Sequence, residues 1–243
     1  MTRRTVSLPL SFALVLSLAV SLLPSNARAE VTAEKRIVEH TGYTLKRGEW
    51  KLGIRESSYG VTDRLQVNSY LLATALIVNA GAKYQLIDAP NLAVAVRGYA
   101  GASLTSLVLQ TQLAMGGAGL DATFPLGDRL AFSGGAQWTV WYLRQADALA
   151  VGTSTRLSWF TVRGGLQWVM APRHVFFLEL TSPTSWNTWI DGGSHDFDMM
   201  DLADGRIGYQ LSRGVANFRL NVGWGPSLFG RGPTAGIDFY VRF

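Results

Sequence analysis

The sequence predicts a closed, antiparallel β-barrel that spans a membrane, and three observations support this fold class. The C-terminal segment Ala235–Phe243 (AGIDFYVRF) alternates apolar residues with polar or charged ones, as expected when successive strand side chains point to opposite faces. Nearly every later segment repeats this alternation, in stretches of about ten residues separated by turn residues, which is the signature of transmembrane barrels. The third observation is an export signal at the N-terminus.

The export signal has the three parts of a secretory signal peptide in the usual order. Arg3 and Arg4 are followed by the apolar run Leu10–Leu23 and by the small residues of Ala27–Arg28–Ala29. The run is shorter than the roughly 20 residues that a membrane-anchoring helix needs. We therefore expect residues 1–29 to be a cleaved signal peptide, and residues 30–243 to form the barrel.

Composition excludes several classes of function. Three of the 22 basic residues and no acids leave with the signal, so the mature chain carries 19 basic against 17 acidic residues, or +2. That balance argues against nucleic-acid binding, which needs a clustered basic face. The chain has no cysteine, so neither a disulfide framework nor thiolate chemistry is expected.

The alternating segments number twelve, with ten as the fallback, and bacterial single-chain barrels favour even numbers. The first is only weakly patterned. The expected strands are Ile37–Leu45, Gly48–Glu56, Arg64–Leu72, Ile77–Ile87, Asn91–Gly101, Leu113–Phe124, Arg129–Leu143, Arg156–Met170, His174–Thr181, Ala203–Leu211, Val215–Trp224 and Ala235–Phe243.

The connectors alternate between short and long, as expected for periplasmic turns and outer loops. Counted back from a periplasmic C-terminus, the short connectors SYGVTD, DAPN, PLGD, APR and SRG all lie on one side. The long connectors Ala102–Gln112, Gln145–Thr155, Ser182–Leu202 and Pro226–Thr234 lie on the other. The weak repeat of Tyr59–Leu65 (YGVTDRL) in Phe124–Leu130 (FPLGDRL) places both copies at the periplasmic rim.

Two features resemble known outer-membrane proteins. The opening of the mature chain, YTLKRGEWKLGIRESSYGVTDRLQV, resembles a family of uncharacterised, porin-like outer-membrane β-barrels of Gram-negative bacteria. The terminal aromatic Phe243 resembles the signal by which such barrels are recognised for assembly. The resemblance implies an outer-membrane location, contact with membrane lipid and with the barrel-assembly machinery, and no catalytic residues.

One face of each expected strand is apolar and should contact lipid; examples are Val162, Leu178 and Leu220. Aromatic residues concentrate near the strand ends, as expected for two girdles at the lipid headgroups. Phe124, Phe132, Trp168, Phe176, Tyr209, Phe218 and Phe243 are expected toward the periplasmic side, and Trp50, Trp138, Tyr142, Phe160 and Trp224 toward the outer side.

The opposite face carries the charged residues, which must face a wet or paired lumen, since a charge in lipid at mid-depth costs about 2–4 kcal/mol. The expected lumen-lining residues are Lys51, Arg55, Lys83, Arg97, Asp121, Arg163, Glu179, Arg206, Arg219, Asp238 and Arg242. With Glu49 included, eight are basic and four acidic. We expect Lys51, Arg55, Lys83 and Arg97 to form one basic wall.

No catalytic or metal site is expected, and no cofactor. Ser194–His195–Asp196 lies in an outer loop, but adjacent residues cannot converge as a triad by themselves. Asp191, Asp196, Asp198, Asp201 and Asp204 cluster on the same loop without the spacing of a calcium loop, so a solvated acidic loop is the simpler interpretation.

We therefore predict a non-enzymatic outer-membrane barrel that passively passes small polar solutes, with a weak preference for anions. One alternative is a plugged barrel with a structural or surface-interaction role, in which Arg–carboxylate pairs fill the lumen. Eight strands enclose a filled interior and 16–18 leave a channel, so twelve strands leave both possibilities open. A hydrolase at the outer rim, around His195, is a further alternative.

Overall fold

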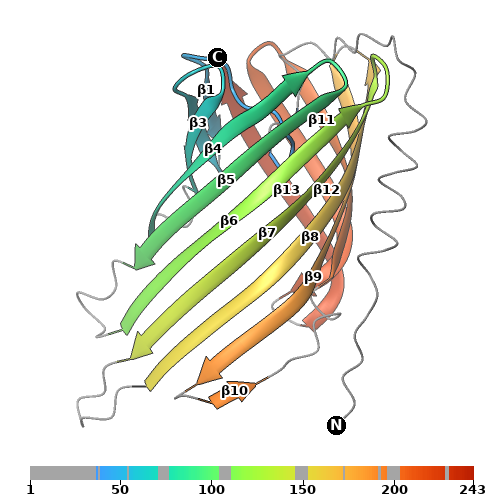
Figure 1. Cartoon of the computed structure of the whole chain (residues 1–243). Helices are drawn as coiled ribbons and strands as arrows, with labels where there is room; N and C mark the ends of the chain where they lie inside the picture. The colour runs from blue at the N-terminus through green and yellow to red at the C-terminus, as the bar shows by residue number, and fades with distance from the viewer. Residues whose placement is uncertain are drawn as a thin grey trace.

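A computed structural model of the chain shows a barrel of long, tilted β-strands, with the C-terminus at one end of the barrel (Figure 1). The structure describes residues 37, 39–53, 55–70, 77–103, 111–145, 153–171, 173–190, 193–195, 203–227 and 230–243. The predicted signal peptide, residues 1–29, lies outside the described part. None of the described residues forms a helix long and apolar enough to cross a membrane.

The described strands form one antiparallel sheet that closes on itself. They are β1 (Trp50–Gly53), β2 (Ser57–Gly60), β3 (Leu65–Ser69), β4 (Ile77–Ala89), β5 (Leu92–Ser103), β6 (Thr111–Pro125), β7 (Leu130–Gln145), β8 (Thr153–Ala171), β9 (His174–Ile190), β10 (Gly193–His195), β11 (Asp204–Arg213), β12 (Ala216–Ser227) and β13 (Gly230–Arg242). Strand β10 forms a short hairpin with β9 alone. The other twelve form the ring, which β1–β13 and β8–β9 pairing closes. The predicted fold class, a closed antiparallel barrel of twelve strands, is confirmed.

Short connections gather at one end of the barrel, which we call the short-turn end; the opposite end is the long-loop end. The short turns join β2–β3, β4–β5, β6–β7, β8–β9 and β11–β12, and the C-terminal Phe243 lies at the same end. Gly127 (φ 81°) and Gly214 (φ 57°) occupy left-handed conformations in two of these turns, which residues with a Cβ adopt only with strain. The side assigned to the short connectors therefore agrees with the structure.

Two predicted strands are wrong, and the two errors cancel in the total of twelve. Ile37–Leu45 is not a strand, because its alternating apolar residues Ile37, Tyr43 and Leu45 are buried inside the barrel rather than exposed on its wall. Gly48–Glu56 does not span the barrel as one strand: it contains β1 and ends just before β2, so this region forms a hairpin of two short strands. Alternating polar and apolar residues show that the two faces of a segment have different surroundings. They do not distinguish a segment inside the lumen from a strand of the barrel wall.

Counting Ile37–Leu45 as a strand also gave the wrong direction for the next predicted strand, Gly48–Glu56. Trp50 was expected at the outer side, but its backbone N–H donates to the Phe243 carbonyl (2.7 Å), which places it at the short-turn end. Some strands are also longer than predicted: β9 continues to Ile190 and β13 begins at Gly230, within segments expected to be loops. The other ten predicted strands coincide with β3–β9 and β11–β13.

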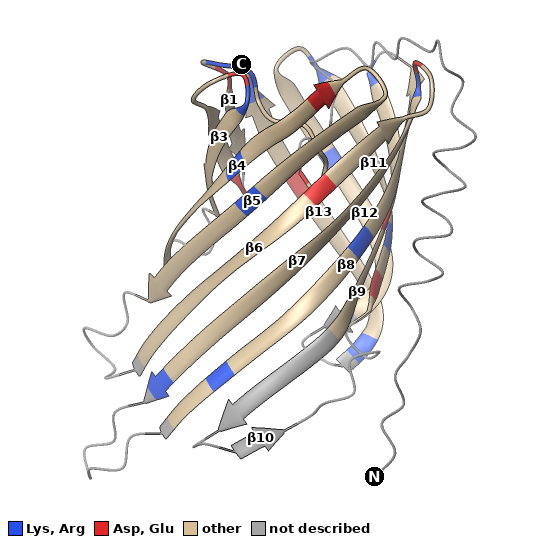
Figure 2. Ribbon diagram, viewed as in Figure 1, with Lys and Arg blue, Asp and Glu red and all other residues tan. Residues whose placement is uncertain are grey.

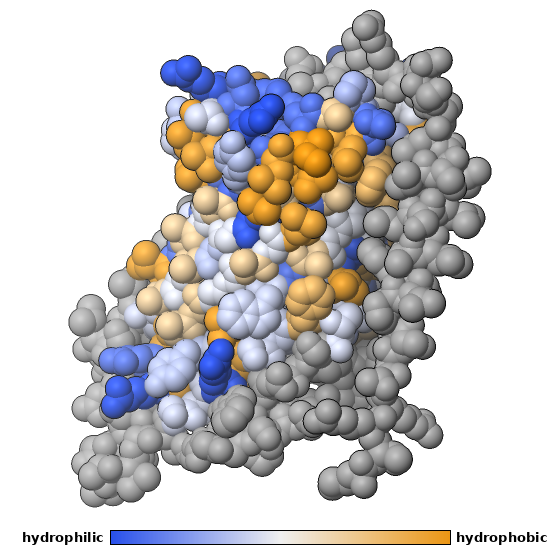
Figure 3. All heavy atoms as spheres, viewed as in Figure 1, coloured by the Kyte–Doolittle hydropathy of each residue, from blue (hydrophilic) through white to orange (hydrophobic). Residues whose placement is uncertain are grey.

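The two faces of the wall differ as the alternation predicts. On β13, Ile237 is 65% exposed on the outside, whereas its neighbour Asp238 is 4% exposed and faces inward. Outside, apolar residues form a band below a hydrophilic cap at the short-turn end (Figure 3). An apolar exterior around a polar interior is the inverse of a soluble barrel and is the arrangement of a transmembrane one.

Candidate functional site: a charged lumen crossed by an inner segment

The lumen is crossed by the chain that precedes β1. We call Ile37 together with residues 39–46 the inner segment. At its start, Ile37 packs against Val175 and Phe177 on the inward face of β9. Further along, it contacts side chains of β3 to β6, on the other side of the ring. The inner segment therefore spans the barrel interior from one wall to the other.

Backbone hydrogen bonds hold the inner segment against the wall. The Gly42 N–H donates to Thr123 Oγ1 on β6 (2.8 Å), and the Leu45 N–H donates to Gln66 Oε1 on β3 (3.1 Å). The Thr44 hydroxyl donates to Gln85 Oε1 on β4 (3.0 Å). Inward polar side chains of the wall thus satisfy the backbone of a segment that has no strand partner, as buried backbone groups require.

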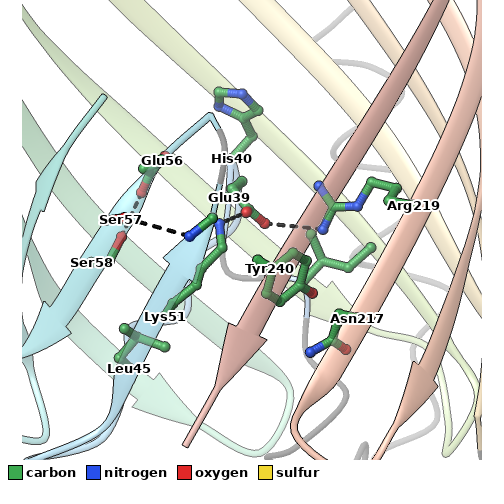
Figure 4. Close-up of polar contacts among 12 residues, drawn as sticks. Glu39, His40, Leu45, Lys51, Glu56, Ser57, Ser58, Asn217, Arg219 and Tyr240 are labelled. Atoms are coloured by element: carbon green, nitrogen blue, oxygen red, sulfur yellow. Dashed lines mark hydrogen bonds and ion pairs between the residues drawn. The ribbon is translucent and has the colours of Figure 1, made fainter. Parts of the chain in front are cut away.

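Glu39 connects the inner segment to two cations on adjacent parts of the wall. Its carboxylate forms ion pairs with Lys51 Nζ on β1 and with Arg219 Nη2 on β12 (3.2 Å), as Figure 4 shows. Both cations are largely buried, and the Tyr240 ring lies 4.8 Å from Lys51 Nζ and 5.5 Å from Arg219 Cζ. Because a buried cation without a partner is costly, these two ion pairs attach the inner segment to the wall.

His40 connects the inner segment to the opposite wall. Its Nδ1 contacts the guanidinium groups of Arg97 (3.1 Å) and Arg163, and its Nε2 lies 3.9 Å from Glu179 Oε1. His40 is not part of a spanning strand, and burial followed by the positive charges of Arg97 and Lys83 lowers its pKa well below 6.5. The ring is therefore neutral at physiological pH, and a neutral Nδ1 can accept hydrogen bonds from arginine.

A cavity of about 440 Å³ lies in the lumen beside the inner segment, with Glu39 and His40 in its lining. The cavity also reaches residues toward the long-loop end of the strands, such as Trp141 and Asp204. Its charged lining is balanced: the arginines are Arg55, Arg97, Arg163, Arg206 and Arg219, and the acids are Glu39, Glu56, Glu179, Asp204 and Asp238. Figure 2 shows basic and acidic positions interspersed along these strands.

The structure brings most of the predicted lumen-lining residues together around this cavity. Arg55, Arg97, Arg163, Glu179, Arg206, Arg219 and Asp238 line it. Lys51, Lys83 and Asp121 are buried inward but do not line it, and Arg242 pairs with Glu49, whose Oε2 lies 3.1 Å from Arg242 Nη2.

The predicted basic wall forms only in part. Lys83 and Arg97 lie directly opposite each other on β4 and β5, and Asp121 lies 3.1 Å from Arg97 Nε. Lys51 instead pairs with Glu39, and strands β2 and β3 separate it from β4. Lys51 is farther from Lys83 than predicted because β2, which is not among the predicted strands, lies between β1 and β3.

The predicted girdle aromatics all lie on outward positions. Most are substantially exposed, and Phe132 is half-buried. Trp50, Phe132, Trp168, Phe176, Phe218 and Phe243 lie toward the short-turn end, and Trp138 and Trp224 lie farther toward the long-loop end. Trp50 is the one residue whose end differs from the prediction.

Sequence reasoning missed several cavity residues. Glu39 and His40 lie in the weakly patterned segment Ile37–Leu45, which the alternation assigns to the wall as a strand, and no local pattern marks them as lumenal. Trp141 and Trp159 form an edge-to-face pair in the cavity lining, with ring centroids 5.6 Å apart. Trp141 shares its parity with the inward Gln137 and Thr139, so the period of two could have identified it.

The predicted rim and metal features lie mostly outside the described part. Ser194 and His195 lie on β10, but four of the five clustered aspartates, Asp196 among them, belong to residues that the structure does not describe. Asp204 pairs with Arg206. Within the described ranges, no group of three or more His, Cys, Asp or Glu side chains could hold a metal ion.

The fold and its lumen define the class: a closed, twelve-stranded antiparallel barrel with an apolar exterior and a charged interior. No protein-family model and no curated protein matches the sequence. Among solved structures, the chain is similar to the NanC porin, with a TM-score of 0.42 and 12% identity over 81% of this chain and 96% of that one.

Two further structures are more distant. The Pseudomonas putida toluene transporter TodX matches with a TM-score of 0.30 and 8% identity, over 80% of this chain and 77% of that chain. LpxR from Salmonella typhimurium matches with a TM-score of 0.25 and 12% identity, over 82% of this chain and 90% of that chain. At these scores the likenesses do not bear on function, and the barrel's own geometry has to indicate what it does.

Proposed function

We propose that this protein is an outer-membrane barrel through which small polar solutes pass, and that the inner segment restricts this passage. The observation that carries the proposal is the charged cavity of about 440 Å³ inside a wall whose outer surface is apolar. Pockets of this size are large enough for small organic molecules.

The outer-membrane location is supported by the predicted signal peptide at residues 1–29, by the apolar exterior and by the terminal Phe243. Phe243 is 59% exposed at the end of the closing strand, where its N–H and carbonyl pair with Trp50. The assembly machinery could therefore reach this side chain before β13 pairs with β1. The short-turn end would then be periplasmic and the long-loop end external.

Beside the inner segment, the described residues enclose two small pockets. Pockets of about 50 and 40 Å³ lie on its two flanks, one against β7–β9 and one against β3–β6. Such volumes hold single waters, which need at least about 10–15 Å³ of this measure. Water can thus occupy both flanks, whereas a larger solute requires the inner segment to move.

The preference for anions stays a prediction, because acids and arginines are equal in number around the cavity. Arg55 and Arg163 are the residues that would carry it. Both line the cavity, and no carboxylate of the described residues lies within ion-pair distance of either one. The contacts of Arg163 are to His40 and to Gln137 Oε1 (2.7 Å), both uncharged.

The alternative of a permanently plugged barrel has an observation in its favour as well. The inner segment is attached at Ile37, Glu39, His40, Gly42 and Leu45, on both sides of the lumen. Attachments this numerous could hold the lumen closed, and the barrel would then serve a structural role.

Planar-bilayer conductance of the refolded protein separates passage from plug. We expect small unitary conductance in the wild type and a larger one in Glu39→Gln, which weakens the attachment to Lys51 and Arg219. Asp128→Asn is the control, since it removes an exposed carboxylate in the β6–β7 turn, outside the cavity. Absence of conductance in the wild type and in Glu39→Gln would refute the proposal and support the plugged barrel.

A further inference from the structure

Two arginines on β7 and β8 face outward, away from the lumen. Arg144 and Arg156 are exposed, and they lie diagonally beside each other, because Tyr142 is opposite Arg156 and Arg144 is opposite Ser154. They share their parity with Trp138 and Phe160, which are exposed on the outer surface. Figure 2 shows the two basic positions side by side near the long-loop ends of these strands.

Among the described residues, no acidic side chain pairs with these arginines. Neither forms an ion pair among the described residues, and the residue opposite Arg144 on the other neighbouring strand, β6, is Gln112. An outward cation on a membrane barrel is stable where its long side chain reaches the polar interface, and it is stabilised there by an anion from outside the protein. Planar guanidinium groups bind phosphate oxygens in pairs, so phosphate is the anion that they favour.

An apolar path leads from the arginines toward the middle of the wall. Trp138 and Phe160 lie directly opposite each other and are 45% and 38% exposed. Beyond them, Gly134 is opposite Gly164, and a Cβ at Gly164 would meet no heavy atom within 4 Å. The missing side chain of Gly164 therefore leaves a depression between bulkier neighbours.

A groove of about 460 Å³ lies beside Gly164, along β8, β9, β11 and β12. Its lining includes the apolar or small residues Val162, Gly164, Leu180, Gly205 and Trp224, together with the charged residues Arg163, Asp204 and Arg231. Six residues separate Arg156 from Val162, which is roughly 20 Å along a strand at about 3.3 Å per residue. A hydrocarbon chain whose headgroup lies at the arginines has to cover a distance of this order to reach the groove.

We propose that this outer surface is a binding site for a phosphorylated membrane lipid of the leaflet at the long-loop end. Arg144 and Arg156 bind the headgroup phosphate, Trp138 and Phe160 contact the upper part of an acyl chain, and the groove beside Gly164 receives its lower part. The site rests on the membrane location in the proposed function, but it does not depend on whether solutes pass through the lumen.

The test measures lipid retained by the folded barrel in detergent, using native mass spectrometry and a titration. The probes are diphosphorylated lipid A, the same lipid without phosphates, and inorganic phosphate. The variants are Arg144→Gln/Arg156→Gln and Gly164→Leu, which fills the depression without changing charge. The control is Arg173→Gln/Arg213→Gln, which removes two exposed arginines at the short-turn end.

We expect the Arg144/Arg156 double variant to bind diphosphorylated lipid about tenfold more weakly, since charge-assisted contacts to phosphate are lost. Gly164→Leu should also weaken binding, the control should match the wild type, and inorganic phosphate should not compete at millimolar concentration. Equal loss in the control, equal binding of the dephosphorylated lipid, or displacement by inorganic phosphate would overturn the proposal. Heat-modifiable migration confirms that each variant is folded, and conductance, measured separately, reports on the lumen.

Discussion

Gly42 lies very close to the barrel wall, and a single methyl group there should loosen the inner segment. A Cβ on Gly42 would lie well under 3.0 Å from the backbone carbonyl of Ala93 on β5, a distance that real Cβ atoms do not show. The wall cannot yield easily, because β5 is paired on both sides, with β4 and with β6. The inner segment therefore has to retreat in Gly42→Ala.

The retreat has a cost that can be worked from the contacts. Overpacking of this kind costs about 1–3 kcal/mol, and loss of the 2.8 Å hydrogen bond from the Gly42 N–H to Thr123 Oγ1 adds about 1 kcal/mol. The resulting total, about 2–4 kcal/mol, destabilises the docked inner segment and leaves the pairing of the wall unchanged. We expect the segment to be displaced for a larger fraction of the time, and the barrel to remain closed.

Single-channel conductance and heat-modifiable migration measure these two consequences. Gly42→Ala should raise the unitary conductance, or its open fraction, while migration of the folded band is retained. Gly164→Ala is the control, since a Cβ at that outward glycine has nothing within 4 Å. Wild-type conductance in Gly42→Ala would contradict the inference that the inner segment restricts the lumen. Loss of the folded band would mean that the segment is required for assembly.

Three further predictions concern faces, assembly and selectivity. Leu178→Arg should destabilise the barrel by about 2–4 kcal/mol near the midplane, and Glu179→Gln should cost less; equal losses in urea unfolding would contradict the assigned faces of β9. Deletion of Phe243 should prevent accumulation in the outer membrane, and a heat-modifiable, protease-resistant product in that membrane would refute the role of the terminal aromatic. In Arg55→Gln/Arg163→Gln, which removes the two cavity arginines without a carboxylate partner among the described residues, anion preference across an asymmetric KCl gradient should fall, and cation preference in the wild type would show that the lumen does not favour anions. Any such preference should fade as salt rises, because the Debye length shrinks from about 10 Å at 0.1 M to 3 Å at 1 M.

The sequence alone determined the fold class and the two faces of most strands. A membrane barrel imposes the same local rule on every residue of its wall: alternate side chains contact apolar and polar surroundings. The rule is visible in β13, where Ile237 and Phe239 are outward and Asp238 and Tyr240 are inward, as the alternation predicts. Turn residues such as Gly127 and Gly214 identified the short-turn end for the same reason, since their signals are local.

Only the tertiary structure decided what occupies the lumen. Residues 37–45 alternate like a strand, but their neighbours are side chains far along the chain: Val175 packs against Ile37, and Thr123 accepts the Gly42 N–H. The ion pairs of Glu39 with Lys51 and Arg219 likewise join positions that share no local pattern. Closure of the ring brings these groups together, and whether a segment lies in the wall or inside it depends on that closure. Periodicity along the chain records only that the two faces of a segment differ, and it contains no information about which other parts of the chain surround them.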